Sequence, residues 1–396
     1  MAAAEVQPVV VLMGARQTGK SRLVRQHPAL AARPYHTLDS VDVRAQAAAN
    51  PLDFLRSAPF LVLDEIQRAT DLILAIKQVV DVDGRRPGRF ILTGSANLLE
   101  MKGVKDTLAG RASYTTLWPL TRRERLGQGQ AGRWSELIAA PVTGWTTLLT
   151  GDAAPPEDWR DAVRRSAYPT PALSDLTTAQ QTIWLQGYLD TYLDRDIVEL
   201  ANIAKPLDLR RLMQAVCVNV GQIENQANWG RAAAMKSSTV LRYLDLLETS
   251  YQLLRIPAYA VNRSKRLALR PKVFWSDTAL ALHIAGNPPL TGFHLENMIA
   301  MDLTAWAWAE AQRPGILHWR THSKEEVDFV IEMPDGWLLP IEVKADSQPG
   351  WSNAGGLRAF LDEYEDRTPG GLVLHCGNDI YQLSDRIVAA PWWKVI

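Results

Sequence analysis

The feature that most constrains this chain is a glycine-containing loop between a short apolar run and a helical pattern. Residues 9–13 read Val-Val-Val-Leu-Met, Gly14 follows, and after four more residues come Gly19-Lys20-Ser21. This is the full G-x-x-x-x-G-K-S/T pattern in the strand–loop–helix setting that it requires. The glycines let the loop curl, so that backbone N–H groups point at phosphate oxygens near the positive end of a helix. The pattern therefore predicts a fold that binds a nucleoside triphosphate.

Each part of this loop has an expected role. Lys20 is expected to reach the β- and γ-phosphates, and the Ser21 hydroxyl is expected to hold Mg²⁺. The alternative is a simple turn with a solvated lysine, which an eight-residue match in the right setting disfavours. The predicted nucleotide-binding residues of the loop are Gly14, Ala15, Arg16, Gln17, Thr18, Gly19, Lys20 and Ser21.

A second strand-like run ends in two adjacent acids. Residues 60–63 are all apolar, as in a parallel strand buried on both faces, and Asp64 and Glu65 follow them. Open α/β sheets bind their ligands at the carboxyl ends of their strands. We therefore expect Asp64 to hold Mg²⁺ through its water shell and Glu65 to polarise the attacking water.

A further strand is predicted over residues 89–97, and its polar end is expected beside the nucleotide. Thr93, Ser95 and Asn97 are the candidates to contact the γ-phosphate or the attacking water, and Ser95 is the preferred one. The alternative is an ordinary turn at the end of a strand.

Composition restricts the class of protein without deciding its partner. A chain of 396 residues is too long for one core and suggests two or three domains. Forty-three basic and 43 acidic residues cancel, so any surface for nucleic acid must be local. Two distant cysteines predict buried thiols rather than disulfides, and no long apolar stretch predicts a membrane span. We expect a cytoplasmic protein.

The order of the motifs in residues 1–150 resembles that of the AAA+ ATPases of the P-loop superfamily. More narrowly, it resembles prokaryotic ATPases with an AAA-type domain followed by a C-terminal domain of unknown function. The resemblance implies ATP as the nucleotide and a homo-oligomer, with a hexameric ring as one candidate. Arg111 stands where such proteins place an arginine that reaches the neighbouring subunit's nucleotide. The alternative is an ordinary salt-bridged surface arginine.

Residues 151–285 are predicted to contain a helical lid and then a winged helix. Helical patterns near 210–220, 225–233 and 237–248 precede two strand-like runs around a basic hairpin. Basic residues concentrated in a neutral chain suit a DNA backbone, although winged helices also dock proteins. The predicted DNA-binding residues are Arg242, Arg263, Lys265, Arg266 and Arg270, with Lys272 also on the wing.

Residues 286–396 are predicted to form a domain with a second site. A hairpin over residues 326–345 carries Asp328 on its first strand and Glu342 and Lys344 on one face of its second. Converging carboxylates bind Mg²⁺ or Mn²⁺, and a lysine beside the metal can orient water. The hairpin resembles the core of PD-(D/E)XK nucleases, a helix with a three- to four-stranded mixed sheet, which implies Glu296 as a further metal ligand. The alternative is an inert carboxylate–lysine cluster.

Together these patterns predict an α/β protein: a P-loop AAA+ domain with a parallel sheet, a helical lid with a winged helix, and a restriction-endonuclease-like domain. The predicted function is ATP-driven processing of branched or partly single-stranded DNA, with Glu65, Arg111 and Lys344 as catalytic residues and metal ligands Ser21, Asp64, Glu296, Asp328 and Glu342. A nucleotide-controlled switch without nuclease activity is the alternative. A signalling or defence ATPase that recognises another protein is a third.

Overall fold

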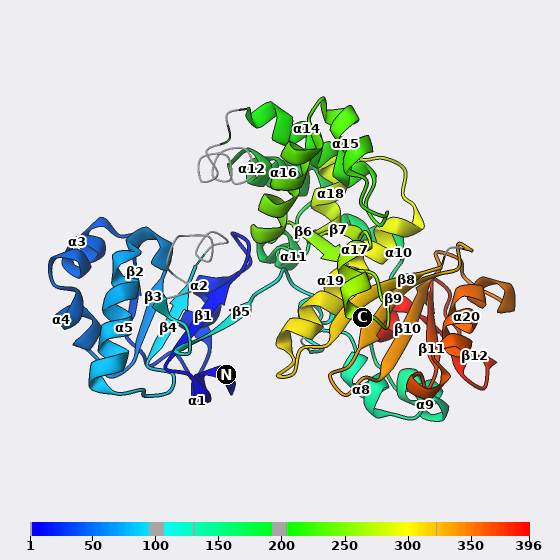
Figure 1. The fold of residues 1–396 in the computed structure, drawn as a ribbon, viewed down its shortest axis with the longest axis horizontal. Helices are drawn as coiled ribbons and strands as arrows, with labels where there is room; N and C mark the ends of the chain where they lie inside the picture. Colours follow the sequence, from blue (N-terminus) through cyan, green and yellow to red (C-terminus); the bar gives the residue numbers. More distant parts are fainter. Residues whose placement is uncertain (1, 95–106, 130, 192–202, 204, 322) are drawn as a thin grey trace. The chain divides into compact units, whose positions relative to one another are not determined.

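The computed structural model describes residues 2–396 except 95–106, 130, 192–202, 204 and 322 (Figure 1). The chain divides into two compact units. The first unit comprises Met1–Trp118 with Thr249–Tyr251, and the second comprises Pro119–Glu248 with Gln252–Ile396. The boundary predicted near residue 150 therefore lies inside the second unit.

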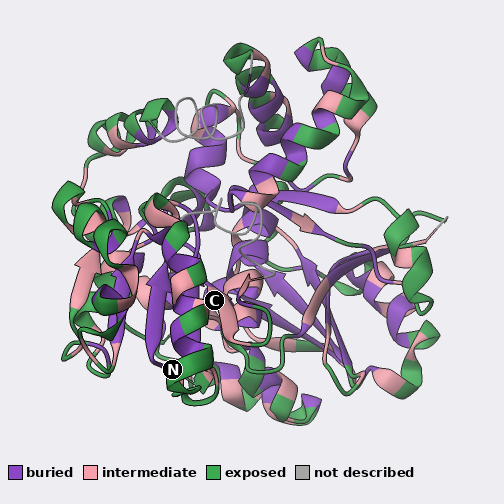
Figure 2. Ribbon diagram, turned by 60° about the vertical axis from the view of Figure 1, so that its left-hand side comes forward, coloured by how far each residue is buried: buried purple, intermediate pink, exposed green. Residues whose placement is uncertain are grey.

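The first unit is built on a five-stranded sheet in the order β2-β3-β4-β1-β5, and every neighbouring pair of strands is parallel. This confirms the predicted parallel sheet. The strands β1, β3 and β4 are buried throughout, because helices and loops cover both faces (Figure 2). The strands are β1 (Val9–Met13), β2 (Tyr35–Thr37), β3 (Leu61–Asp64), β4 (Phe90–Thr93) and β5 (Ala112–Thr116).

Local sequence features explain where helices of this unit begin and end. Residues 41–56 form two helices, α3 (Val41–Ala49) and α4 (Pro51–Arg56), and not one continuous helix. Pro51 has no N–H for a continuous helix, and the Asn50 side chain caps the second helix instead. The other helical elements are α1 (Ala2–Val6), α2 (Lys20–Gln26), η1 (Ile66–Ala69) and α5 (Asp71–Asp83).

The second unit begins with a run of helices. Among the described residues, no helix has both the length and the apolar character needed to cross a bilayer. The helices before its first strand are α7 (Arg122–Arg125), α8 (Trp134–Ala139), α9 (Val142–Thr150), α10 (Trp159–Arg164), α11 (Pro169–Leu173), α12 (Thr178–Tyr188), α14 (Pro206–Val218), α15 (Gln226–Ala233) and α16 (Ser237–Thr249).

The segment predicted as a winged helix has the expected order of helices α14, α15 and α16 and then an antiparallel pair of strands, β6 (Leu253–Ile256) and β7 (Lys272–Trp275). The connection between the strands is not the predicted basic hairpin turn. It contains the short helix α17 (Arg263–Ala268), which begins where the Asn262 side chain accepts the N–H of Ser264.

The carboxyl-terminal part carries a six-stranded mixed sheet in the order β12-β13-β11-β10-β9-β8. It is larger than the predicted three- to four-stranded sheet, because two strands after β11 extend it. Its core includes Trp319, Val330, Phe360 and Val373. The remaining elements are α18 (Thr278–Ile284), α19 (Gly292–Ala309), β8 (Gly315–Arg320), β9 (Glu326–Glu332), β10 (Leu338–Val343), η4 (Trp351–Ala354), α20 (Gly355–Glu363), η5 (Glu365–Arg367), β11 (Gly371–His375), β12 (Tyr381–Ser384), β13 (Ile387–Pro391) and α21 (Trp392–Val395).

Candidate functional site

The loop between β1 and α2 has a backbone that depends on its glycines. Gly14 has a φ of +145°, and a Cβ at this position would overlap the carbonyl oxygen of Leu117. Gly19, with a φ of +96°, precedes the first residue of α2. Positive φ values of this kind are costly for residues with a Cβ. The spacing of the two glycines therefore reflects the shape of the loop, as the sequence pattern predicts.

Lys20 is the buried cation of this loop. Only 5% of the residue is exposed, and its Nζ donates to the carbonyl oxygens of Gly14 at 3.0 Å and Ala15 at 2.7 Å. Burial lowers the pKa of Lys20 to about 8, although the charges of Glu65 and Asp64 partly oppose the shift. A buried ammonium that is held mainly by neutral carbonyls gains from a nearby anion. This environment fits the β- and γ-phosphates of a nucleotide.

Asp64 lies beside the first turn of α2 and collects three hydroxyl donors. The Ser21 hydroxyl donates to Oδ1 at 3.1 Å, and the Thr93 hydroxyl also donates to Oδ1. The Tyr35 hydroxyl donates to Oδ2 at 2.6 Å. Adjacent hydroxyl and carboxylate oxygens are ligands that suit Mg²⁺, so Ser21 and Asp64 fit the predicted metal.

Tyr35 of β2 is a site residue that the sequence patterns did not predict. The parallel register pairs Thr37 with Asp64, and side chains two apart on a strand share a face. Burial, followed by the hydrogen bond to Asp64, raises the pKa of the Tyr35 hydroxyl, which therefore stays protonated and donates. The sequence offers no signal for this contact without the register of β2 and β3.

Glu65, the predicted base, stands directly after β3 with an unusual backbone. Its φ of +60° is left-handed, a conformation that non-glycine residues adopt rarely and mostly at functional sites. Its N–H donates to the Thr93 hydroxyl at 3.1 Å, and the Gln67 amide donates to its carboxylate. Thr93 therefore touches both acids instead of standing free for phosphate. Ser95 and Asn97 lie outside the described residues.

Arg111 pairs within its own unit. Its guanidinium donates to Asp81 at the end of α5 through two bonds, of 2.6 Å and 2.8 Å. The hydrogen bond from Arg111 lowers the pKa of the Asp81 carboxyl. This is the geometry of the alternative interpretation, a salt-bridged arginine, and the role toward a neighbouring subunit stays a prediction.

The predicted metal-binding acids of the carboxyl-terminal part lie near one another, but an unpredicted lysine stands among them. The side chain of Lys272, from β7, is 2% exposed, and its Nζ lies 2.9 Å from Asp328 Oδ1 and 3.3 Å from Glu296 Oε2. Glu326 Oε1 is closer still, at 2.6 Å. The expectation that Lys272 belongs to an exposed wing is wrong, because β7 packs against α19 and buries this residue.

The other two predicted residues of this cluster pair with each other. Lys344 Nζ donates to Glu342 Oε1 at 2.6 Å. Burial, with the charge of Asp328 second, raises the pKa of Glu342 to about 8 in spite of Lys344. Burial alone would lower the pKa of Lys272, but the charges of Asp328, Glu296 and Glu326 outweigh it and hold the pKa above its ordinary value. Within the described part of the chain, no group of three or more His, Cys, Asp or Glu side chains has the arrangement of a metal site.

The predicted DNA-binding residues differ in how accessible their charged groups are to a ligand. Arg263, Lys265 and Arg270 are exposed around α17, and Arg242 is exposed on α16. Arg266 is not free, because its guanidinium pairs with Glu332 of β9 through bonds of 2.6 Å and 2.9 Å. The tip of the β6–β7 connection therefore presents three of the four basic residues predicted there.

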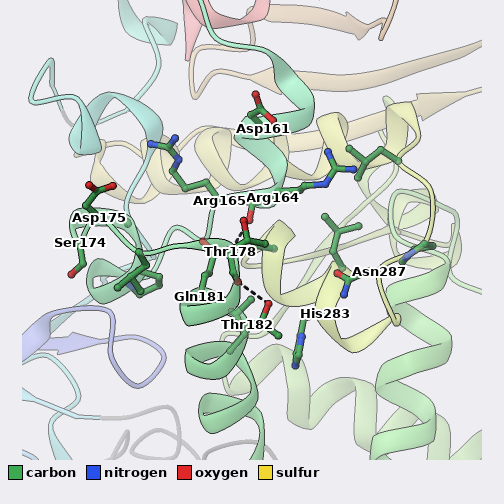
Figure 3. Close-up of a pocket in the computed structure, with 18 residues that line it drawn as sticks. Asp161, Arg164, Arg165, Ser174, Asp175, Thr178, Gln181, Thr182, His283 and Asn287 are labelled. Atoms are coloured by element: carbon green, nitrogen blue, oxygen red, sulfur yellow. Dashed lines mark hydrogen bonds between the residues drawn. The ribbon is translucent and has the colours of Figure 1, made fainter.

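A polar cavity of about 510 Å³ lies elsewhere in the second unit, between α10, α12 and α18 (Figure 3). Arg164, Gln181 and His283 line it, and the Gln181 amide donates to the carbonyl of Arg164 at 2.7 Å. None of its described lining residues belongs to the predicted sites, so the sequence patterns offered no ligand for it.

Three segments of the chain match known family models. Residues 6–126 match an AAA domain, residues 156–291 match a domain of unknown function (DUF8612), and residues 291–395 match another domain of unknown function (DUF4143). The first match shows that residues 6–126, which contain the loop of residues 14–21, are similar to AAA domains.

Relatives and solved structures extend the comparison. An uncharacterized protein of Mycobacterium tuberculosis is 27% identical over 97% of this chain and 80% of its own length. An uncharacterized protein of Haemophilus influenzae is 22% identical over 90% of this chain and 87% of its own length. The Walker-type ATPase of Pyrococcus abyssi aligns at 14% identity and a TM-score of 0.43, over 72% of this chain and 92% of that one. A RuvB variant of Thermotoga maritima aligns at 15% identity and a TM-score of 0.27, over 66% and 87%.

Proposed function

We propose that this protein binds and hydrolyses ATP with Mg²⁺ at the loop of residues 14–21, and that the nucleotide cycle controls what the second unit binds. The observation that carries the proposal is the 3.1 Å contact between Ser21 and Asp64 beside the buried Lys20. A site for a nucleotide with magnesium requires a lysine that binds the phosphates and oxygen ligands that bind the metal ion.

In this proposal each side chain has one task. Lys20 binds the β- and γ-phosphates, and Ser21 and Asp64 hold Mg²⁺, which supplies charge neutralisation to the transferring phosphoryl group. The Glu65 carboxylate accepts a proton from the attacking water. Thr93 positions both acids, because its hydroxyl donates to Asp64 and accepts the N–H of Glu65.

The test is an ATPase assay combined with nucleotide binding measured by calorimetry. Lys20→Ala is expected to lose both binding and turnover, whereas Glu65→Gln is expected to bind ATP and to hydrolyse it at least about 100-fold more slowly. Arg22→Ala, which removes an exposed charge two residues after Lys20, serves as the matched control. Turnover by Lys20→Ala at the rate of the control would overturn the proposal.

We further propose DNA as the ligand that the second unit binds, through the exposed basic residues around α17. Arg263 and Lys265 form no ion pair with any described carboxylate, so their charges are available to a phosphate backbone. A partner protein with an acidic surface is the competing occupant. The predicted metal-dependent cleavage of DNA is disfavoured, because Lys272 already neutralises the predicted metal ligands Glu296 and Asp328.

The salt dependence of binding tests whether DNA is the ligand of the second unit. Affinity for duplex and forked DNA is expected to fall with rising salt, and an Arg263→Gln/Lys265→Gln/Arg270→Gln variant is expected to reduce that slope by roughly two to three ion equivalents. Lys324→Gln, which removes an exposed charge elsewhere in the unit, should leave the slope unchanged. Absence of DNA binding at low salt would favour a protein partner.

A further inference from the structure

We infer that the ammonium of Lys272 is the built-in cation of the carboxylate cluster, standing where a nuclease with these residues would hold a divalent metal ion. Three carboxylates converge on it, from Glu296 on α19 and from Glu326 and Asp328 on β9, at 3.3, 2.6 and 2.9 Å. An ammonium has three N–H donors, and here it meets three carboxylate oxygens, so its hydrogen-bonding capacity is satisfied.

Other oxygens of the cluster are engaged as well, whereas Glu342 Oε2 is buried without a hydrogen-bond partner among the described residues. Asp328 Oδ2 accepts the backbone N–H of Val343 at 2.9 Å, while its Oδ1 accepts from Lys272. Glu342 Oε1 accepts from Lys344. A metal ion would need several of these oxygens at once, and it would have to expel the ammonium to reach them. The residues present therefore do not fit a divalent ion while Lys272 stays in place.

The backbone of β7 gives Lys272 little freedom to leave. The Asn297 side chain on α19 accepts the N–H of Trp275 at 2.6 Å and donates to its carbonyl at 2.9 Å. On the same strand, Val273 exchanges two backbone hydrogen bonds with residues 221 and 222, at 2.7 Å and 3.0 Å. Lys272 is thus anchored by its strand as well as by its charge, and the cluster joins the β6–β7 pair to the larger sheet.

This assignment predicts that one substitution creates a metal site. We would titrate Mn²⁺ into the full chain, without nucleotide, and count bound ions by electron paramagnetic resonance. Lys272→Met is expected to hold about one equivalent of Mn²⁺ more than the wild type, because it leaves hard carboxylate ligands without their cation. Adding Asp328→Asn to that variant should remove the extra ion. Lys265→Met, which removes an exposed lysine of α17, is the control.

Two results would overturn the assignment. One is a wild-type protein that binds a Mn²⁺ ion lost in Asp328→Asn, and the other is a folded Lys272→Met variant that gains no ion. A second measurement uses the wild type alone. Reductive methylation read by mass spectrometry should leave Lys272 protected with or without Mn²⁺, while Lys265 reacts. Mn²⁺-dependent exposure of Lys272 would show that the metal displaces the ammonium, contrary to the assignment.

Discussion

The Ser21 hydroxyl lies 3.1 Å from Oδ1 of Asp64, a residue 43 positions further along the chain. Ser21 lies in α2 after β1, and Asp64 is the last residue of β3; these two strands are not neighbours in the sheet, since β4 lies between them. Thr93 at the end of β4 forms hydrogen bonds with both Asp64 and Glu65. The order of the strands thus brings the loop and the two acids to one edge, where the nucleotide is expected.

Nucleotide affinity is expected to fall as the pH rises above about 8. Burial lowers the pKa of Lys20 to about 8, so the free protein loses this proton above that pH. Bound phosphates favour the charged ammonium and raise its pKa, so binding takes up a proton in that range and none below it. Calorimetry in buffers of different ionisation enthalpy at pH 7 and pH 9 measures the uptake. Equal uptake by the wild type at the two pH values would contradict the assignment to Lys20.

Lys20→Met is expected to stabilise the free protein while removing nucleotide binding. Burial lowers the pKa of Lys20 from 10.5 to about 8. The charged lysine therefore costs up to about 3 kcal/mol of folding free energy below pH 8, and this cost disappears as the pH approaches 10.5. Chemical denaturation at pH 7 and pH 10 without nucleotide tests the sign. A variant less stable than the wild type at pH 7 would refute it.

Thr93→Val is expected to lower the turnover of ATP about tenfold or more while changing nucleotide affinity little. Valine keeps the shape of the side chain but removes the hydroxyl that positions Asp64 and Glu65. Thr93→Ser restores a hydroxyl and should recover most of the rate. Steady-state kinetics with binding measured in parallel separate the two parameters. If Thr93→Ser loses as much turnover as Thr93→Val, the loss comes from altered packing and not from the missing hydroxyl.

Arg111→Ala and Asp81→Asn distinguish the two roles of Arg111. If Arg111 acts on a neighbouring subunit's nucleotide, its removal should lower the ATPase rate about tenfold or more, whereas Asp81→Asn should preserve it. Assays across protein concentration should then show a rate per subunit that rises steeply in the wild type. If both variants change the ATPase rate by the same small amount, Arg111 has only the structural role of the ion pair with Asp81.

Local patterns carry much of this protein's organisation. The loop of residues 14–21 and the acids after β3 are readable from the sequence, because glycine positions, an apolar run and the residue types at its end are local properties. The hairpin that carries Asp328 and Glu342 is readable for the same reason, and the structure pairs its strands as antiparallel neighbours. The loop and the strand end that form the candidate nucleotide site are therefore set by the local sequence.

The partners of the charged side chains were decided only by the tertiary structure. Lys272 lies 24 residues before Glu296 and 56 before Asp328, and Arg266 meets Glu332 across 66 residues. A sequence shows that a lysine is basic but not whether packing will bury it among acids, since its neighbours come from elements far along the chain. Burial then changes the chemistry, because a cation removed from water must be paired. For that reason Lys272, which the sequence places on an exposed basic wing, forms a closed ionic cluster with the predicted metal ligands Glu296 and Asp328.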